Sequence, residues 1–149
     1  MPQSLSQAYL HLVFSIKDRH SWISPSWECD LWAYVAGAGS SHGCQVIKVG
    51  GVEDHLHVLI RQSRTRTIAD LVSSLKVESS KWVKANQQNP LFCWQFGYGA
   101  FSVSQSNVDA VIDYIASQRE HHAKHTFQDE FRALLSKHKV AWDERYVWD

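Results

Sequence analysis

The chain has little of what several specialised protein classes require. Its 149 residues include only three cysteines, three prolines and seven glycines, which argues against a disulfide scaffold and against a low-complexity segment. The fifteen basic and fifteen acidic residues cancel, so the overall charge does not announce a nucleic-acid-binding protein. No apolar run approaches membrane-spanning length, and residues 1–7 lack the basic and apolar segments of a signal peptide.

What is present is the composition of an ordinary globular protein. Apolar residues make up 44% of the chain and charged residues 20%, and the length suits one domain, residues 1–149, with a sizeable core. The three cysteines have no metal-finger spacing, so we interpret them as small, mostly buried thiols. A cytoplasmic location, with no membrane contact, is therefore expected.

Hydrophobic periodicity predicts alternating strands and helices. Short runs rich in apolar and β-branched residues predict strands at 9–16, 44–49, 52–60 and 92–104. Helical spacing of apolar residues predicts helices at 27–41, 67–86, 107–122 and 130–138. Thr67 is expected to cap the second helix, and Gly50-Gly51 to form a hairpin turn. The order β-α-β-β-α-β-α predicts an α+β, ferredoxin-like (RRM-like) βαββαβ sandwich with an antiparallel sheet and an extra C-terminal helix.

The triplet His55-Leu56-His57 lies inside the third predicted strand. Side chains alternate between the two faces of a strand, so both imidazoles project to one side, with Cα atoms roughly 7 Å apart. We expect Leu56 to face the core and the histidines to face the open side of the sheet. Two converging imidazoles form half of a divalent-metal site.

The helix predicted from residue 107 is the best candidate to lie across that open face. It carries Tyr114 and Gln118, four residues apart and therefore on one side of the helix. Gln118 offers a carbonyl oxygen as a third metal ligand, and Tyr114 offers a phenol that can act as a nucleophile. Such a site suits Mg²⁺ or Mn²⁺ with phosphate oxygens in the remaining positions.

Each of these residues also has an ordinary structural interpretation. Alternating histidines on a strand are more often surface or hydrogen-bonded residues, and Tyr114 adjoins the apolar stripe of its helix. Glutamine side chains on helices are usually solvated, which is the ordinary interpretation of Gln118. His121-His122 could approach the metal, but we interpret them as a solvated helix end, and we interpret His11 as structural.

Residues along nearly the whole chain, from Tyr9 onward, resemble a known family. His55-Leu56-His57 is followed about sixty residues later by Tyr-x-x-x-Gln, and the segments at 14–19, 97–104 and 144–149 match as well. Together these motifs resemble the HUH-class single-tyrosine transposases of the insertion-sequence 200/605 type.

The resemblance implies a mechanism and partners. Family members bind single-stranded DNA that carries hairpins at the element ends, and the tyrosine forms a 5′-phosphotyrosine link and frees a 3′-hydroxyl. They are homodimers joined through their sheets, and the tyrosine helix can serve the histidines of the other subunit. By this resemblance Tyr114 is the nucleophile, His55, His57 and Gln118 hold the metal, and the active sites can form in trans.

Local basic clusters and one aromatic residue are the expected DNA contacts. The basic residues follow the histidine strand or lie on the next helix: Arg61, Arg64, Arg66, Lys76 and Lys81. Tyr98, between two glycines, could itself be reactive, but we interpret it as a residue that packs or stacks on bases. Two alternative functions stay open. One is a noncatalytic single-stranded nucleic-acid-binding module of RRM-like shape, and the other is a host-adopted relative that cleaves extragenic hairpins.

Overall fold

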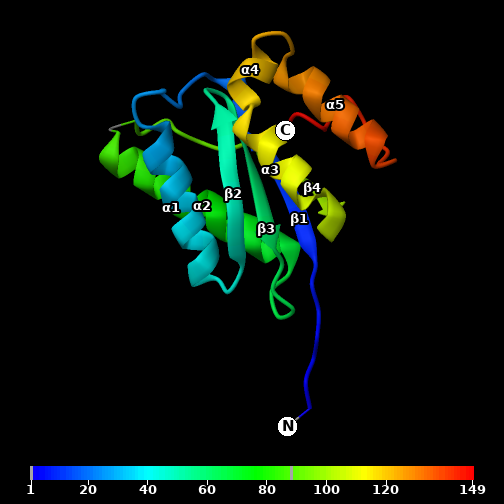
Figure 1. Ribbon diagram of the computed structural model, residues 1–149. Coiled ribbons are helices and arrows are strands. Elements are labelled where there is room, and N and C mark those ends of the chain that lie inside the picture. Colours follow the sequence, from blue (N-terminus) through cyan, green and yellow to red (C-terminus); the bar gives the residue numbers. More distant parts are fainter. Residues whose placement is uncertain (1, 88) are drawn as a thin grey trace.

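A four-stranded antiparallel sheet forms the centre of the computed structural model, which describes residues 2–87 and 89–149 (Figure 1). Met1 and Gln88, which belong to the predicted domain, lie outside the described residues. The strands are β1 (Tyr9–Ser15), β2 (Gln45–Val52), β3 (His55–Arg61) and β4 (Gly99–Val103). The helices are η1 (Lys17–Arg19), α1 (Glu28–Ser41), α2 (Ile68–Asn86), η2 (Gln105–Asn107), α3 (Val108–Ala116), α4 (Gln118–His122) and α5 (Phe127–Lys137).

The strand order β2-β3-β1-β4, with every pair antiparallel, confirms the predicted α+β architecture. Helices α1 and α2 cover one face of the sheet, and α3, α4 and α5 lie over the other (Figure 1). The first face encloses the main core, where Leu12, Phe14 and Leu56 are fully buried. Thr67 caps α2 as predicted, because its side-chain oxygen accepts a hydrogen bond from the Asp70 amide.

The hairpin between β2 and β3 turns at a different place from the one predicted. Gly50 and Gly51 lie inside β2, and residues 53–54 make the turn. Gly50 is needed for another reason, since a Cβ atom there would lie 2.6 Å from the carbonyl oxygen of Ile115. The glycine therefore allows α3 to approach the sheet closely. In the sequence, the Gly50-Gly51 pair resembles a turn signal although it lies inside a strand.

The tail after α5 folds back onto the body. Trp148 packs against Phe127 and Phe131, and the carbonyl oxygen of Asp149 accepts a hydrogen bond of 2.9 Å from the Gly97 amide. Trp148 thus attaches the tail to the body, whereas Trp142 and Tyr146 are exposed. Two of the three cysteines, Cys29 and Cys93, are exposed, so the expectation of mostly buried thiols is wrong. Within residues 2–87 and 89–149, no helix has the length and apolar character needed to cross a membrane.

Candidate metal centre and nucleophile

The histidine pair projects from β3 toward the face covered by α3 and α5. Leu56 lies between them and is buried in the core on the opposite face, as strand alternation predicts. The helix with Tyr114 lies across this face as expected, but the face is not otherwise open, because α5 also covers it and His55 and His57 are both 0% exposed. Their imidazoles therefore lie in a low-dielectric interior, where every polar atom requires a partner.

Each imidazole of the pair has a partner on its Nδ1 atom. His55 Nδ1 lies 2.6 Å from Asp54 Oδ1, and His57 Nδ1 lies 2.8 Å from Nε2 of His11 on β1. His11, interpreted from the sequence as structural, is thus part of the site and is 3% exposed. Its antiparallel pairing with Leu59 places its side chain beside His57.

Tyr114 and Gln118 reach the histidines of their own chain, although not from one continuous helix. The predicted helix 107–122 is divided at Ser117, whose φ of −98° and ψ of 16° end α3 and begin α4. Gln118 is 1% exposed, and its Oε1 atom lies 3.2 Å from His55 Nε2. Tyr114 is half-buried, and its hydroxyl donates a hydrogen bond to Glu130 Oε2.

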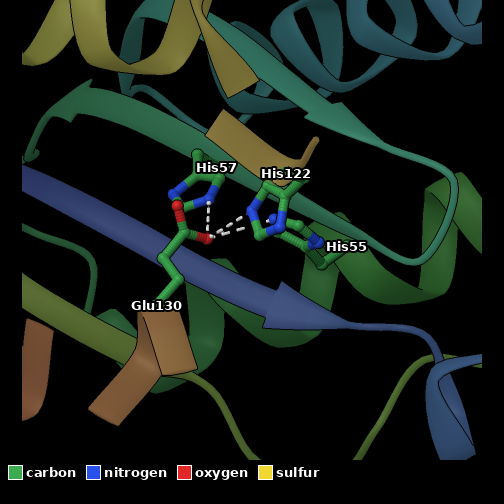
Figure 2. A group of neighbouring side chains, drawn as sticks. All are labelled: His55, His57, His122 and Glu130. Atoms are coloured by element: carbon green, nitrogen blue, oxygen red, sulfur yellow. Dashed lines mark hydrogen bonds and ion pairs between the residues drawn. The ribbon is translucent and has the colours of Figure 1, made fainter. Parts of the chain in front are cut away.

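The centre also contains His122 and Glu130, which were not predicted from the sequence to belong to it. Figure 2 shows the imidazoles of His55, His57 and His122 converging on the carboxylate of Glu130. Glu130 Oε1 lies 3.2, 3.0 and 3.0 Å from the Nε2 atoms of His55, His57 and His122, respectively. The interpretation of His122 as a solvated helix end is wrong, since its side chain is only 10% exposed.

A sequence signal for Glu130 does exist. The apolar residues Phe127, Phe131 and Leu135 form the buried stripe of α5, and Glu130 lies within that stripe and is 3% exposed. A carboxylate on the buried side of an amphipathic helix requires a compensating partner. The spacing could therefore have indicated a functional carboxylate, although not which residues it meets.

Burial and the shared carboxylate shift the pKa values at this centre. Burial would raise the pKa of Glu130, but hydrogen bonds from His122, His55 and His57 outweigh it and hold the pKa well below its usual range. Burial and the Glu130 charge raise the pKa of the Tyr114 hydroxyl far above its ordinary value. Burial opposes protonation of His55, yet hydrogen bonds to Asp54 and Glu130 raise its pKa to about 9. Burial lowers the pKa of His57 and of His11.

Two surface pockets meet at Tyr114. One, of about 300 Å³, is lined by Tyr114, Glu130, His121 and Asp129 among others. The other, of about 310 Å³, is lined by Tyr114, His11, Ser102 and His138 among others. The phenol is therefore reachable from outside although the histidine pair is buried, so an extended ligand can approach Tyr114 without unfolding the site.

The basic residues predicted to contact DNA lie away from this centre. Arg61 ends β3, six residues after His55, which corresponds to about 20 Å along the strand. Arg61 and Arg64 are exposed and line a shared surface pocket. Arg66 is half-buried, and its guanidinium donates to Ser74 Oγ.

Lys76 and Lys81 lie on α2, across the sheet from the histidine pair. The ammonium group of Lys76 donates to the carbonyl oxygens of Gln95, Phe96 and Gly97, at 2.8, 3.0 and 2.7 Å, and lies over the Tyr98 ring. Lys76 therefore anchors the 95–97 loop. Lys81 is exposed, and Tyr98 is 38% exposed. Their DNA contacts, like those of the arginines, stay predictions.

A family model described as "Transposase IS200 like" matches residues 4–118. No curated protein matches this chain. Two solved structures are similar in fold. A candidate transposase from Deinococcus radiodurans R1 is 20% identical, with a TM-score of 0.62 over 79% of this chain and 98% of that one. A REP-associated tyrosine transposase bound to a REP hairpin is 10% identical, with a TM-score of 0.60 over 82% of this chain and 72% of that one.

Proposed function

Because this chain belongs to the family of IS200-like transposases, we propose that it cleaves and rejoins single-stranded DNA with Tyr114 as the nucleophile. One observation carries the proposal. The Tyr114 hydroxyl donates a hydrogen bond to one oxygen of the Glu130 carboxylate, and the other oxygen contacts both His55 and His57. Any buried phenol needs a hydrogen-bond partner, but this partner places the Tyr114 hydroxyl beside the histidine pair, and a nucleophile must lie beside the groups that activate it.

The proposed step exchanges one phosphodiester for another. The Tyr114 oxygen forms a bond to phosphorus, the bond from phosphorus to the 3′ oxygen breaks, and a 5′-phosphotyrosine and a free 3′-hydroxyl result. The proton lost by the phenol is balanced by the one gained at the 3′ oxygen. Attack by that 3′-hydroxyl on the phosphotyrosine reverses the exchange and reseals a strand. No external energy source is required, because the number of phosphodiester bonds is conserved.

The donor set fits a divalent cation, Mg²⁺ or Mn²⁺, held by His55, His57 and Gln118. His55 Nδ1 is hydrogen-bonded to Asp54, so its Nε2 atom is the one that could bind the ion, and Gln118 Oε1 lies 3.2 Å from that atom. When bound, the ion would polarise the scissile phosphate and stabilise its developing charge. The protein itself aligns Tyr114, and burial excludes competing water from the histidine pair.

We further propose that one domain of residues 1–149 acts as a homodimer on DNA that carries a hairpin. The REP-bound relative, similar in fold, supports the choice of a hairpin substrate. The contacts of Tyr114 and Gln118 with groups of their own chain support an active site formed in cis. Mixing Tyr114→Phe and His57→Ala chains separates the arrangements, because a mixed dimer regains a complete site only when the tyrosine acts in trans.

A covalent-adduct assay tests the nucleophile. Single-stranded oligonucleotides from the flanks of the gene are labelled, incubated with the protein and Mn²⁺, and run on a denaturing gel. We expect an adduct that EDTA and Tyr114→Phe abolish and that the matched Tyr98→Phe control retains. Binding without any adduct would favour the noncatalytic RRM-like module. An adduct lost in Tyr98→Phe but kept in Tyr114→Phe would move the nucleophile to Tyr98.

A further inference from the structure

The part of the chain beyond residue 118, where the family match ends, adds two groups to the candidate centre. His122 comes from the end of α4, and Glu130 from the buried side of α5. Together with His55 and His57 they form a set in which the four ligand atoms all lie within 4.8 Å of one another (Figure 2). One ion could therefore touch every member of this set with small side-chain adjustments.

The Nδ1 contacts of the three imidazoles resemble those of histidines that bind a metal through Nε2. All three Nδ1 atoms have a hydrogen-bond partner: Asp54 Oδ1 for His55, His11 Nε2 for His57, and the carbonyl oxygen of His125 for His122, at 2.6, 2.8 and 2.8 Å. A histidine that binds a metal through Nε2 almost always donates its Nδ1–H to such a partner. With each Nδ1–H donated to its partner, Nε2 is the atom of each imidazole that could bind a metal.

The three Nε2 atoms face one carboxylate oxygen of Glu130, at separations of 3.0–3.2 Å. In this buried region the charge of Glu130 requires a compensating positive charge. Protons on the imidazoles provide that charge without a metal, and a divalent ion among the four atoms would provide it in their place. We propose that His122 and Glu130 are metal ligands that join His55, His57 and Gln118, so that three imidazoles, one carboxylate and one amide oxygen hold the ion.

Glu130 also connects this ligand set to the nucleophile. Its Oε1 atom faces the imidazoles, whereas its Oε2 atom accepts the hydrogen bond from the Tyr114 hydroxyl. The ligand role stands on the geometry of the imidazoles alone. The connection to catalysis rests on the proposed function, because it requires Tyr114 to be the attacking group. In that case Glu130 orients the phenol oxygen, and a bound ion would help to hold the Glu130 carboxylate in place.

The enlarged set predicts a preference among metals. Imidazole nitrogen suits first-row transition ions, whereas Mg²⁺ prefers oxygen ligands and keeps several waters. Three imidazoles and one carboxylate should therefore bind Mn²⁺ more tightly than Mg²⁺. The enlarged set therefore favours Mn²⁺, whereas the pair His55 and His57 alone does not distinguish Mn²⁺ from Mg²⁺.

Calorimetric titration of the full chain with Mn²⁺ tests the ligands without any DNA. We expect Glu130→Gln and His122→Ala each to weaken Mn²⁺ binding by about tenfold or more, since even loss of a residue behind a ligand costs that much. Matched controls are Asp129→Asn, an exposed carboxylate on the same helix, and His42→Ala, across the sheet. Both should bind Mn²⁺ like the wild type. Unchanged affinity in Glu130→Gln and His122→Ala would overturn the proposal.

A measurement on the wild-type chain covers the case in which a variant fails to fold. Bound Co²⁺ shifts the Nδ1–H proton signals of coordinating imidazoles far outside the normal NMR range. We expect three such exchangeable signals, protected by Asp54, His11 and the His125 carbonyl. Two signals, or no bound Co²⁺, would overturn the ligand role of His122.

These outcomes are independent of the proposed function. If the DNA adduct forms through Tyr114 but Mn²⁺ affinity ignores His122 and Glu130, the enlarged ligand set is wrong and the transposase chemistry stands. If Mn²⁺ affinity depends on both residues but no adduct forms on any flank, the ligand set stands and the proposed function fails.

Discussion

The Tyr114 hydroxyl donates a hydrogen bond to the Glu130 carboxylate, sixteen positions further along the chain. The contact joins α3 to α5 and links the proposed nucleophile to the three imidazoles around Glu130 Oε1. It also explains why the hydroxyl stays protonated, since burial and the neighbouring negative charge both raise the pKa of Tyr114. The phenol oxygen is thus positioned beside Glu130 but is not ionised.

Replacing Tyr114 by Phe should abolish adduct formation and lower the stability modestly. The substitution removes one hydroxyl, and Glu130 Oε2 keeps a contact with His121 Nε2, at 3.4 Å. We expect a loss of about 1–2 kcal/mol in the free energy of unfolding, measured by urea denaturation. A variant that fails to fold would show that Tyr114 is chiefly a packing residue.

Replacing His11 by Phe should weaken metal binding without removing a ligand. His11 accepts the Nδ1–H of His57 in the proposed tautomer, and a phenyl ring keeps the packing against Phe101 and Tyr114 but not the acceptor. We expect Mn²⁺ affinity to fall by about 10–100-fold in calorimetric titration. His138→Phe, on the neighbouring surface, is the control and should retain the wild-type affinity. Equal affinities in both variants would contradict this role of His11.

Adding a methyl group at Gly50 should displace α3 and with it Tyr114. A Cβ atom there would lie 2.6 Å from the Ile115 carbonyl oxygen and 2.9 Å from its side chain. We expect Gly50→Ala to cost about 1–3 kcal/mol in the free energy of unfolding and to slow adduct formation by about 100-fold. Gly37→Ala is the matched control, because nothing lies within 4 Å of the added atom. It should stabilise the chain by about 0.5–1 kcal/mol and leave the rate unchanged.

Lys76 should matter for stability, and Lys81 should not. Replacing Lys76 by Met leaves the carbonyl oxygens of residues 95–97 without their shared donor. We expect a loss of about 1–3 kcal/mol in the free energy of unfolding for Lys76→Met, measured by urea denaturation. The exposed Lys81→Met should change it by less than about 0.5 kcal/mol. Equal effects would mean that the three hydrogen bonds do not stabilise the loop.

Arg61 and Arg64 should contribute to DNA affinity through phosphate contacts. Both are exposed and close together, so each can neutralise one phosphate. We expect the double variant Arg61→Gln/Arg64→Gln to reduce the slope of log affinity against log salt by about 1.8 for a hairpin stem. Fluorescence anisotropy at several salt concentrations measures this slope. An unchanged slope would remove these arginines from the DNA surface.

Local patterns in the sequence determined most of the fold. Alternating apolar residues marked the strands, helical spacing marked α1 and α2, and Thr67 marked the start of α2. The same alternation put Leu56 in the core and His55 and His57 together on the other face. These features depend on interactions between near neighbours, so a sequence window contains them.

Only the tertiary structure decided how the centre is completed. His11, His122 and Glu130 come from β1, α4 and α5, and their meeting depends on strand register and on the close approach of helices to the sheet. The turn predicted at Gly50 is wrong for the same reason. Gly50 makes room for α3, which comes from a distant part of the chain. Periodicity assigns a residue to a face, but packing between distant segments decides which other residues share that face.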